Sequence, residues 1–170
     1  QFQRATTLIC ACEIIRQEDE RRLGEEKISI GLWVGSNLTP NSTKASIESL
    51  RALIGDSEHN NPFQLLSCPW CGTKLVKEGR RGRWGYREGK RPSRFIIYCT
   101  EPNCEFHDEL PVKIVDEDIY NNPPTLLFGT VDKFALMPWK GEVSNIFALN
   151  KNNPNLSPEL IIQDELHLIE

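Results

Sequence analysis

The sequence has no apolar run long enough to cross a membrane and no basic-then-apolar leader at its start. A membrane helix needs roughly 18 or more consecutive apolar residues, and no stretch of this chain approaches that length. An excess of positive charge is also missing, since the formal net charge is -4, so the chain is not a polycation built as a whole for nucleic acid. We therefore expect a soluble, cytoplasmic protein that forms one ordinary domain, or a compact core with a small insertion.

Six cysteines stand in a chain that shows no export signal. Disulfides stabilise small secreted proteins, whereas a chain of 170 residues can build a core without them. We therefore expect reduced thiols, some of which bind a metal. Cys10 and Cys12 lie two residues apart on a predicted helix, which points them to different sides. Both are expected to be core or half-buried thiols.

The other four cysteines form two pairs with the spacing of metal ligands. Cys68 and Cys71 belong to a Cys-x-x-Cys-Gly knuckle, and Cys99 and Cys104 are separated by four residues. Two such loops that face each other supply four thiolates to one tetrahedral zinc ion, with no open position for a substrate. The spacing therefore predicts a structural zinc site. His107 is an alternative fourth ligand if Cys104 turns away, and a redox pair is the competing interpretation of Cys68 and Cys71.

The segment between the two cysteine pairs is basic, although the whole chain is acidic. From Lys74 to Arg94 there are nine Lys or Arg and two Glu, interleaved with aromatic residues. Positive charge with aromatic side chains is typical of segments that follow phosphates and stack bases. A solvated hairpin tip is an equally good interpretation, because most charged runs are only that. The candidate nucleic-acid contacts in this segment are Arg80, Arg81, Arg83 and Trp84.

Helix and strand patterns alternate on both sides of this segment. Apolar residues recur at helical spacing from position 2 to about 22 and predict one buried face, made of Phe2, Ala5, Leu8, Ile9, Cys12 and Ile15. β-branched and aromatic content predicts strands at 28–35 and 125–130. Further helices are predicted at 43–54, capped by Ser42 or Asn41 and closed by Gly55, at 116–120, and at 131 to about 137, capped by Thr130.

This order is expected of an α/β sheet built from right-handed crossovers. The stretch from about 60 to 115 does not extend the alternation, so we interpret it as a zinc-binding insertion. The expected organisation is a first part of the sheet domain at 1–59, the insertion with its basic hairpin at 60–115, and a second part of the sheet domain at 116–170.

Two adjacent acidic residues follow the last predicted strand. The apolar run Leu160–Gln163 predicts a buried strand of a parallel sheet, and Asp164 and Glu165 follow it directly. Parallel sheets place their working residues where the strands end, where one acid can hold a metal through water and the other can polarise a water nucleophile. The alternative for the acids is a solvated cap of the strand. For His167 the alternative is a hydrogen-bonded core histidine.

Several of these motifs together resemble a known family. The tract Asp164-Glu165-Leu166-His167 resembles motif II of the superfamily 2 helicases in its Asp-Glu-x-His form. The segment Gly129–Phe134 looks like the strand-to-helix motif with which the same group touches the nucleic-acid backbone. The combination of sequence segments is similar to the large helicase of DISARM-type antiphage defence systems. These segments are Gly-Leu-Trp-Val-Gly-Ser, a cysteine insertion and Gln-Asp-Glu-Leu-His-Leu-Ile.

The resemblance implies a partial RecA-like fold of the P-loop NTPase type with a zinc-ribbon-like insertion. It implies an ATP-dependent helicase or translocase that acts on single-stranded DNA or a duplex end. By the same resemblance, Asp164 would hold magnesium through water, Glu165 would orient and deprotonate the attacking water, and His167 would link the nucleotide state to the grip on nucleic acid. Thr130 would contact a backbone phosphate, with Asp132 and Lys133 close by.

The sequence departs from the family in one respect: it contains no Gly-x4-Gly-Lys-Ser/Thr phosphate loop. We therefore expect a fragment of the first motor domain, whose acids are catalytic with Mg and ATP in the intact parent and idle in the fragment. One alternative is a noncatalytic zinc-ribbon module that binds nucleic acid. Another is a docking platform for protein partners of a defence complex.

Overall fold

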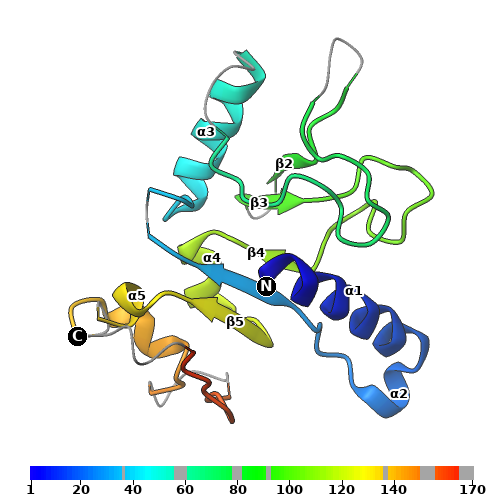
Figure 1. The fold of residues 1–170 in the computed structure, drawn as a ribbon. Coiled ribbons are helices and arrows are strands. Elements are labelled where there is room, and N and C mark those ends of the chain that lie inside the picture. The colour runs from blue at the N-terminus through cyan, green and yellow to red at the C-terminus, as the bar shows by residue number, and fades with distance from the viewer. Residues whose placement is uncertain are drawn as a thin grey trace.

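The computed structural model describes residues 1–35, 37–55, 61–77, 82–90, 93–135, 138–149 and 156–164. A parallel three-stranded sheet lies at the centre of the molecule, in the order β4-β1-β5, and helices pack around it (Figure 1). A separate antiparallel hairpin, β2 (Tyr86–Lys90) and β3 (Ser93–Ile97), lies above the sheet in this view. The predicted α/β class is confirmed, and the parallel sheet is consistent with a partial RecA-like fold.

The parallel sheet is short but regular. Its central strand β1 (Ile30–Trp33) pairs with β5 (Leu126–Gly129) along its whole length and with β4 (Val112–Lys113) at its start. The strands predicted at 28–35 and 125–130 are therefore confirmed. β4 was not predicted, because two residues carry too little periodicity to separate a strand from the cysteine-rich segment before it.

The helices begin and end near their predicted positions. α1 (Phe2–Glu18) and α2 (Glu20–Leu23) divide the first predicted helix at Asp19, and α3 (Thr43–Gly55) starts where the Ser42 hydroxyl accepts the Ala45 amide at 3.2 Å. The shorter elements are α4 (Asp116–Asn121), α5 (Val131–Ala135) and a 3-10 helix (Gly141–Asn145). Among the described residues, no helix is long and apolar enough to cross a membrane.

The buried face of α1 is the predicted one only in part: Ile9 is buried and Phe2 and Ala5 pack against the core, as predicted, but two other members of the predicted face are exposed. Leu8 and Ile15 are 63% and 57% exposed. The residues of α1 that face the interior are Thr6, Ile9, Cys10, Glu13 and Arg16. The apolar pattern was misleading because a buried ion pair holds the C-terminal half of this face: the Arg16 guanidinium donates to both Glu13 carboxylate oxygens at 2.8 and 2.9 Å.

One hydrophobic core joins the sheet to the cysteine segment. It contains Ile9 and Cys10 of α1, Ile30 of β1 and Leu53 of α3, and it continues into buried Cys99. α1 also contacts the first cysteine loop directly, where the Thr7 hydroxyl donates to the Pro69 carbonyl at 3.1 Å. The cysteine loops are therefore packed into the body of the molecule, while the domain boundaries at 59/60 and 115/116 stay a prediction.

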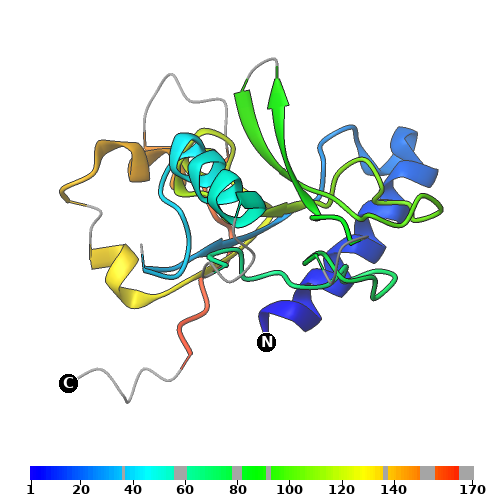
Figure 2. The ribbon, with the colours of Figure 1, turned by 90° about the horizontal axis from the view of Figure 1, so that it is seen from above.

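The prediction of a buried strand at Leu160–Gln163 is wrong in this structure. These residues form no strand, and Leu160, Ile161 and Ile162 are 75%, 67% and 80% exposed. The run has the composition of a strand, but it pairs with neither edge of the described sheet, and a strand needs such a partner to satisfy its backbone. Figure 2 shows this last described segment extending away from the sheet.

Candidate metal centre and strand-end site

The first cysteine pair sits on a tight turn. The Thr73 carbonyl accepts the Cys68 amide at 2.7 Å, and the Cys68 carbonyl accepts the Gly72 amide at 3.0 Å. Gly72 has a φ of +79°, in the left-handed region where a glycine avoids the strain that a side chain would cause. This turn brings the Cys68 and Cys71 side chains to the same end of the loop.

The second pair is held by a similar loop. The Phe106 carbonyl accepts the Cys99 amide at 2.9 Å, and the Glu101 carbonyl accepts the Cys104 amide at 3.1 Å. The Glu101 amide also points at the Cys99 sulfur, at 3.5 Å. Amides directed at sulfur are typical of loops that hold metal-bound thiolates, because they stabilise the negative charge.

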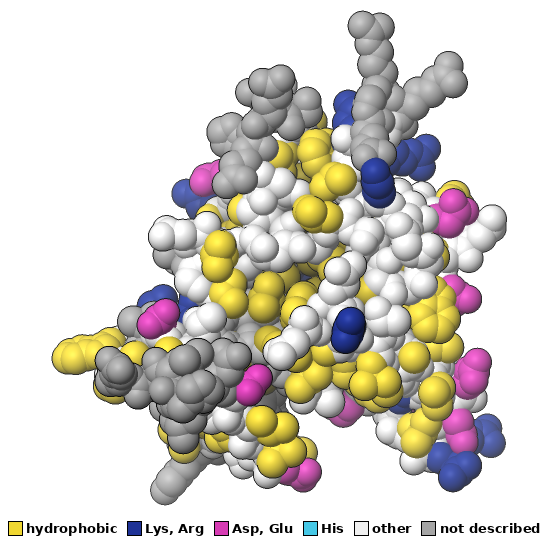
Figure 3. Space-filling view, viewed as in Figure 1, with side chains coloured by type: hydrophobic (Ala, Val, Ile, Leu, Met, Phe, Trp, Pro, Cys, Tyr) yellow, Lys and Arg dark blue, Asp and Glu magenta, His cyan; other side chains and the backbone are white. Residues whose placement is uncertain are grey.

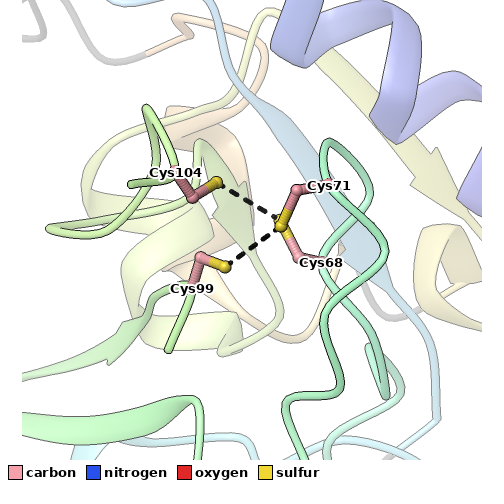
Figure 4. Close-up of side chains that lie close together, drawn as sticks. All are labelled: Cys68, Cys71, Cys99 and Cys104. Carbon is pink, nitrogen blue, oxygen red and sulfur yellow. Dashed lines mark hydrogen bonds between the residues drawn. The ribbon is translucent and has the colours of Figure 1, made fainter. Parts of the chain in front are cut away.

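The two loops bring all four sulfurs together (Figure 4). The Sγ atoms lie within 4.8 Å of one another, with 3.4 Å between Cys71 and Cys99 and 3.9 Å between Cys68 and Cys104. Four sulfurs about 2.3 Å from a tetrahedral zinc ion are about 3.8 Å apart, so these separations match a zinc site to within a small adjustment. The four cysteines can therefore hold a metal ion, and the set leaves no ligand position for a substrate.

His107 is not part of this cluster. Its Nδ1 atom lies 3.1 Å from the Cys99 carbonyl oxygen, and its amide donates to the Cys104 carbonyl at 2.9 Å. The structure thus favours Cys104 over His107 as the fourth ligand. The histidine instead contacts the backbone of the second cysteine loop.

The four thiols differ in environment. Cys68, Cys99 and Cys104 are buried and Cys71 is exposed. Burial raises the pKa of Cys99 to about 11. Partial burial also opposes ionisation of Cys71, but hydrogen bonds to the side chain and backbone of Thr73 outweigh it and lower the Cys71 pKa to about 7. Because the thiolate is the metal-binding form, Cys71 loses its proton more readily than Cys99.

The two remaining cysteines are core thiols, as predicted. Cys10 is fully buried, and this burial, together with the nearby Cys68, raises its pKa to about 12. Cys12 is partly buried. Neither belongs to the group of four that can hold a metal.

A pocket of about 470 Å³ opens beside the cysteine cluster. Its walls come from both cysteine loops and the start of the hairpin, and its polar side chains are Thr73, Lys74, Arg83 and Thr100. Figure 3 shows Lys and Arg side chains at the top of the molecule, above the sheet. Of the predicted nucleic-acid contacts here, Arg83 is exposed, whereas Trp84 is half-buried with its ring stacked on Tyr86 at 6.5 Å. Arg80 and Arg81 lie outside the described residues.

The C-terminal ends of the three parallel strands form the second site. Thr130 follows β5 directly and is exposed, and its amide donates to the carbonyl of Trp33 at the end of β1, at 3.2 Å. Asp132 is exposed, whereas Lys133 is 3% exposed and its amine donates to Asp116 Oδ2. Asp116 is the first residue of α4, three positions after the end of β4, so the three strand exits meet here.

A comparison with curated proteins supplies the relationship. Over 203 aligned residues the chain is 34% identical to the DISARM protein DrmA of Bacillus paralicheniformis, and the match covers 99% of the chain. The chain is a homologue of a DISARM protein. It spans 18% of the length of DrmA. No protein-family model matches the chain. The resemblance to the DISARM system found in the sequence motifs is therefore confirmed.

The acidic motif of this DISARM homologue is described only in part. Asp164 is exposed and is the last residue that the structure describes, while Glu165 and His167 lie outside the described residues. The roles of these three residues stay predictions. Because Leu160–Gln163 is not a strand here, Asp164 does not stand at the end of a described strand.

Two residues of the sites were missed by the sequence patterns. Thr73 lies two positions after Cys71, and its sequence signal is a hydroxyl residue directly after a Cys-x-x-Cys-Gly turn. Asp116 carries a weaker signal, an acid at the first position of a helix, which is common in any protein. Its partner Lys133 lies 17 residues away, and nothing local in the sequence joins the two.

Proposed function

We propose that this chain forms part of the first motor domain of an ATP-dependent nucleic-acid helicase or translocase that acts in antiphage defence. The observation that carries the proposal is the 34% identity to a DISARM protein over 99% of the chain. The parallel sheet supports it, because motor domains of this class place nucleotide and nucleic acid at the C-terminal ends of parallel strands.

In this proposal the acidic tract serves ATP hydrolysis in the intact protein. Asp164 is the residue that would hold magnesium through water, and Glu165 would orient and deprotonate the water that attacks the γ-phosphate. His167 would link the nucleotide state to the grip on nucleic acid. These roles come from the family motif, and Asp164 is exposed in the structure.

The strand-end site and the basic segment would both contact DNA. Thr130 has an exposed side chain at the end of β5, where a hydroxyl can donate to a backbone phosphate, and Asp132 lies beside it. Arg83 lines the pocket between the cysteine loops and the hairpin, and Arg80, Arg81 and Trp84 belong to the same segment. Exposed arginines can follow phosphates, and the predicted ligand is single-stranded DNA or a duplex end.

The four cysteines would hold a structural zinc ion. The separations between their sulfurs fit a tetrahedral site, and three of the four are buried in the core that also contains β1. In this position the ion would tie together the two cysteine loops, the first of which contacts α1, next to the hairpin that packs against α3. It supplies no chemistry to the reaction, because all four ligand positions are taken by thiolates.

The decisive experiment is DNA-stimulated ATP hydrolysis by the intact protein that contains this chain. Glu165→Gln removes the proposed general base, and we expect it to lower the turnover number by at least about a hundredfold. Glu159→Gln is the matched control, because Glu159 is an exposed glutamate six residues earlier, and its activity should stay at the wild-type level. Full activity of Glu165→Gln would refute the motor assignment.

The basic pocket beside the cysteine cluster supports a second candidate, a noncatalytic module that binds nucleic acid or docks a protein partner of a defence complex. Its described walls come from the two cysteine loops and the start of the hairpin. Under this alternative the intact protein binds DNA with an affinity that falls as salt rises and as Arg83 is replaced by alanine, but it hydrolyses no ATP in the presence of DNA. ATP hydrolysis that depends on Glu165 decides for the motor.

A further inference from the structure

A buried ion pair lies where the three strand exits meet. Lys133 and Asp116 are 3% and 1% exposed, and the lysine amine donates to Asp116 Oδ2. Thr130 and Asp132, which lie close to Lys133 in the sequence, are exposed. A lysine within the strand-to-helix segment Gly129–Phe134 thus points inward, away from the surface on which nucleic acid is proposed to bind.

The pair continues into a network that reaches the central strand. The Tyr120 hydroxyl donates to Asp116 Oδ2 at 3.4 Å, and the Trp33 indole donates to the Tyr120 oxygen at 3.0 Å. The Lys133 amine also lies 6.0 Å from the centre of the Trp33 ring. Trp33 is the last residue of β1, so the lysine of α5 is connected to both the α4 helix and the end of the sheet.

The first turn of α4 also holds the loop that leaves β1. The Asp116 and Glu117 amides donate to the Pro40 and Asn41 carbonyls at 3.4 and 3.1 Å, and the Glu117 carboxylate accepts the Thr43 amide at 2.8 Å. Asp116 therefore stands between two strand exits: its backbone contacts the loop after β1, and its side chain contacts the helix after β5.

The backbone around Thr130 is packed against the same network. A Cβ atom on Gly129 would lie 3.0 Å from the Phe134 ring and 3.2 Å from the Trp33 ring, so a side chain at this position would crowd both rings. The Phe134 and Trp33 rings meet edge to face with centroids 5.2 Å apart. The position of Thr130 is thus set by contacts on its inner side, and Lys133 is the charged one among them.

We propose that Lys133 is a positioning residue, which together with Asp116 fixes Thr130 and the loop after β1 relative to each other on the nucleic-acid face. The inference rests on the proposed function and assigns to Lys133 a role other than a phosphate contact. For the lysine to reach a phosphate it would have to leave Asp116 as a buried, unpaired carboxylate. Such an exchange is unfavourable, because a buried charge without a partner destabilises the protein by far more free energy than one exposed phosphate contact contributes to binding.

Within the described part of the chain, the second carboxylate oxygen of Asp116, Oδ1, accepts no hydrogen bond. Loss of the lysine would therefore leave the carboxylate with the Tyr120 hydroxyl and no positive charge. The expected response is a shift of α5 that carries Thr130 with it. The same shift is expected when Asp116 loses its charge and Lys133 is left unpaired.

The test measures binding of the intact protein to single-stranded DNA over a range of salt concentrations. The variants are Lys133→Met, Asp116→Asn and the double variant, with Lys44→Met as a control for the loss of an exposed lysine. We expect each single variant at the ion pair to weaken binding about tenfold, as for the coupling of residues in contact, and the double variant to recover most of the loss. The dependence of log affinity on log salt should keep its slope in all of them.

A direct phosphate contact gives the opposite pattern. Lys133→Met would then lower the salt slope by about 0.7, and Asp116→Asn would leave binding unchanged or tighter because it releases the amine. That pattern overturns the inference, as does a fall in melting temperature of the single variants with unchanged DNA affinity. If a single variant does not fold, the double variant, which buries no unpaired charge, decides by its affinity and slope. Wild-type protein that binds no DNA overturns the proposed function itself, and the inference with it.

Discussion

The buried pair in α1 leads to a quantitative prediction. Glu13 is 1% exposed and accepts hydrogen bonds from Arg16, from Gln17 and from the Ile28 amide at the entry to β1. Burial alone raises the pKa of the Glu13 carboxyl, but the hydrogen bonds outweigh it and lower the pKa from 4.5 to about 2. A shift of this size corresponds to about 3 kcal/mol of stability, similar to the loss expected when one member of a buried pair is removed.

The sign of the pH dependence follows from the lowered pKa. The folded protein holds Glu13 ionised at pH values where the unfolded chain would already bind a proton. The contribution of Glu13 is therefore complete above the unfolded pKa of 4.5 and is lost as the pH falls toward 2. Glu13→Gln should lower the free energy of unfolding by about 3 kcal/mol at pH 7, and the difference should shrink to near zero at pH 2.

The assay is thermal unfolding of wild type, Glu13→Gln and Glu20→Gln across this pH range. For a chain of this length, about 3 kcal/mol corresponds to a melting temperature lower by about 6–12 °C. Glu20 is the control, because its carboxylate also contacts Arg16, at 3.3 Å, but is 54% exposed. Such a surface pair contributes at most about 1 kcal/mol, so Glu20→Gln should melt close to wild type. Equal melting temperatures of the two variants would refute this account of α1.

Two further predictions concern the cysteine loops. Zinc binding contributes about 10–16 kcal/mol to the folding of small zinc domains, which exceeds the free energy of unfolding of most domains. A strong chelator should therefore abolish cooperative unfolding, and Cys12→Ser should keep its metal. An unchanged melting temperature after chelation would speak against a structural ion. A Cβ at Gly85 would lie 2.6 Å from the Leu75 side chain and 2.8 Å from the Tyr98 carbonyl oxygen. Gly85→Ala should therefore destabilise the protein by about 1–3 kcal/mol in urea unfolding, whereas Gly55→Ala, with open space around it, should not.

Elements with strong local signals were predictable from the sequence. α3 carries a capping Ser42 and a terminal Gly55, and both appear in the structure. Of its predicted apolar face, Ile47 and Leu50 are buried, whereas Ile54 is 60% exposed. The cysteine cluster was predictable for a similar reason, because Cys-x-x-Cys-Gly and Cys-x4-Cys each form a self-contained loop. Each loop forms from local contacts, and the tertiary structure only has to place the two loops side by side.

Features that depend on distant partners were not predictable. The C-terminal half of the buried face of α1 is set by Glu13, whose partners include the Ile28 amide beyond the turn, so counting apolar residues placed Ile15 on the buried side although it is exposed. Leu160–Ile162 has strand composition, but a strand exists only where another strand offers its backbone. Lys133 looked like a surface contact because its neighbours are, and only the position of Asp116 in space shows otherwise.

We propose a closed four-thiolate zinc centre that is built into the same core as the parallel sheet. X-ray absorption at the zinc edge of the purified protein tests it most directly, because it reports the metal and its ligands together. We expect one zinc per chain with four sulfur ligands at about 2.3 Å. Protein without zinc, or zinc with nitrogen or oxygen among its ligands, would contradict the claim.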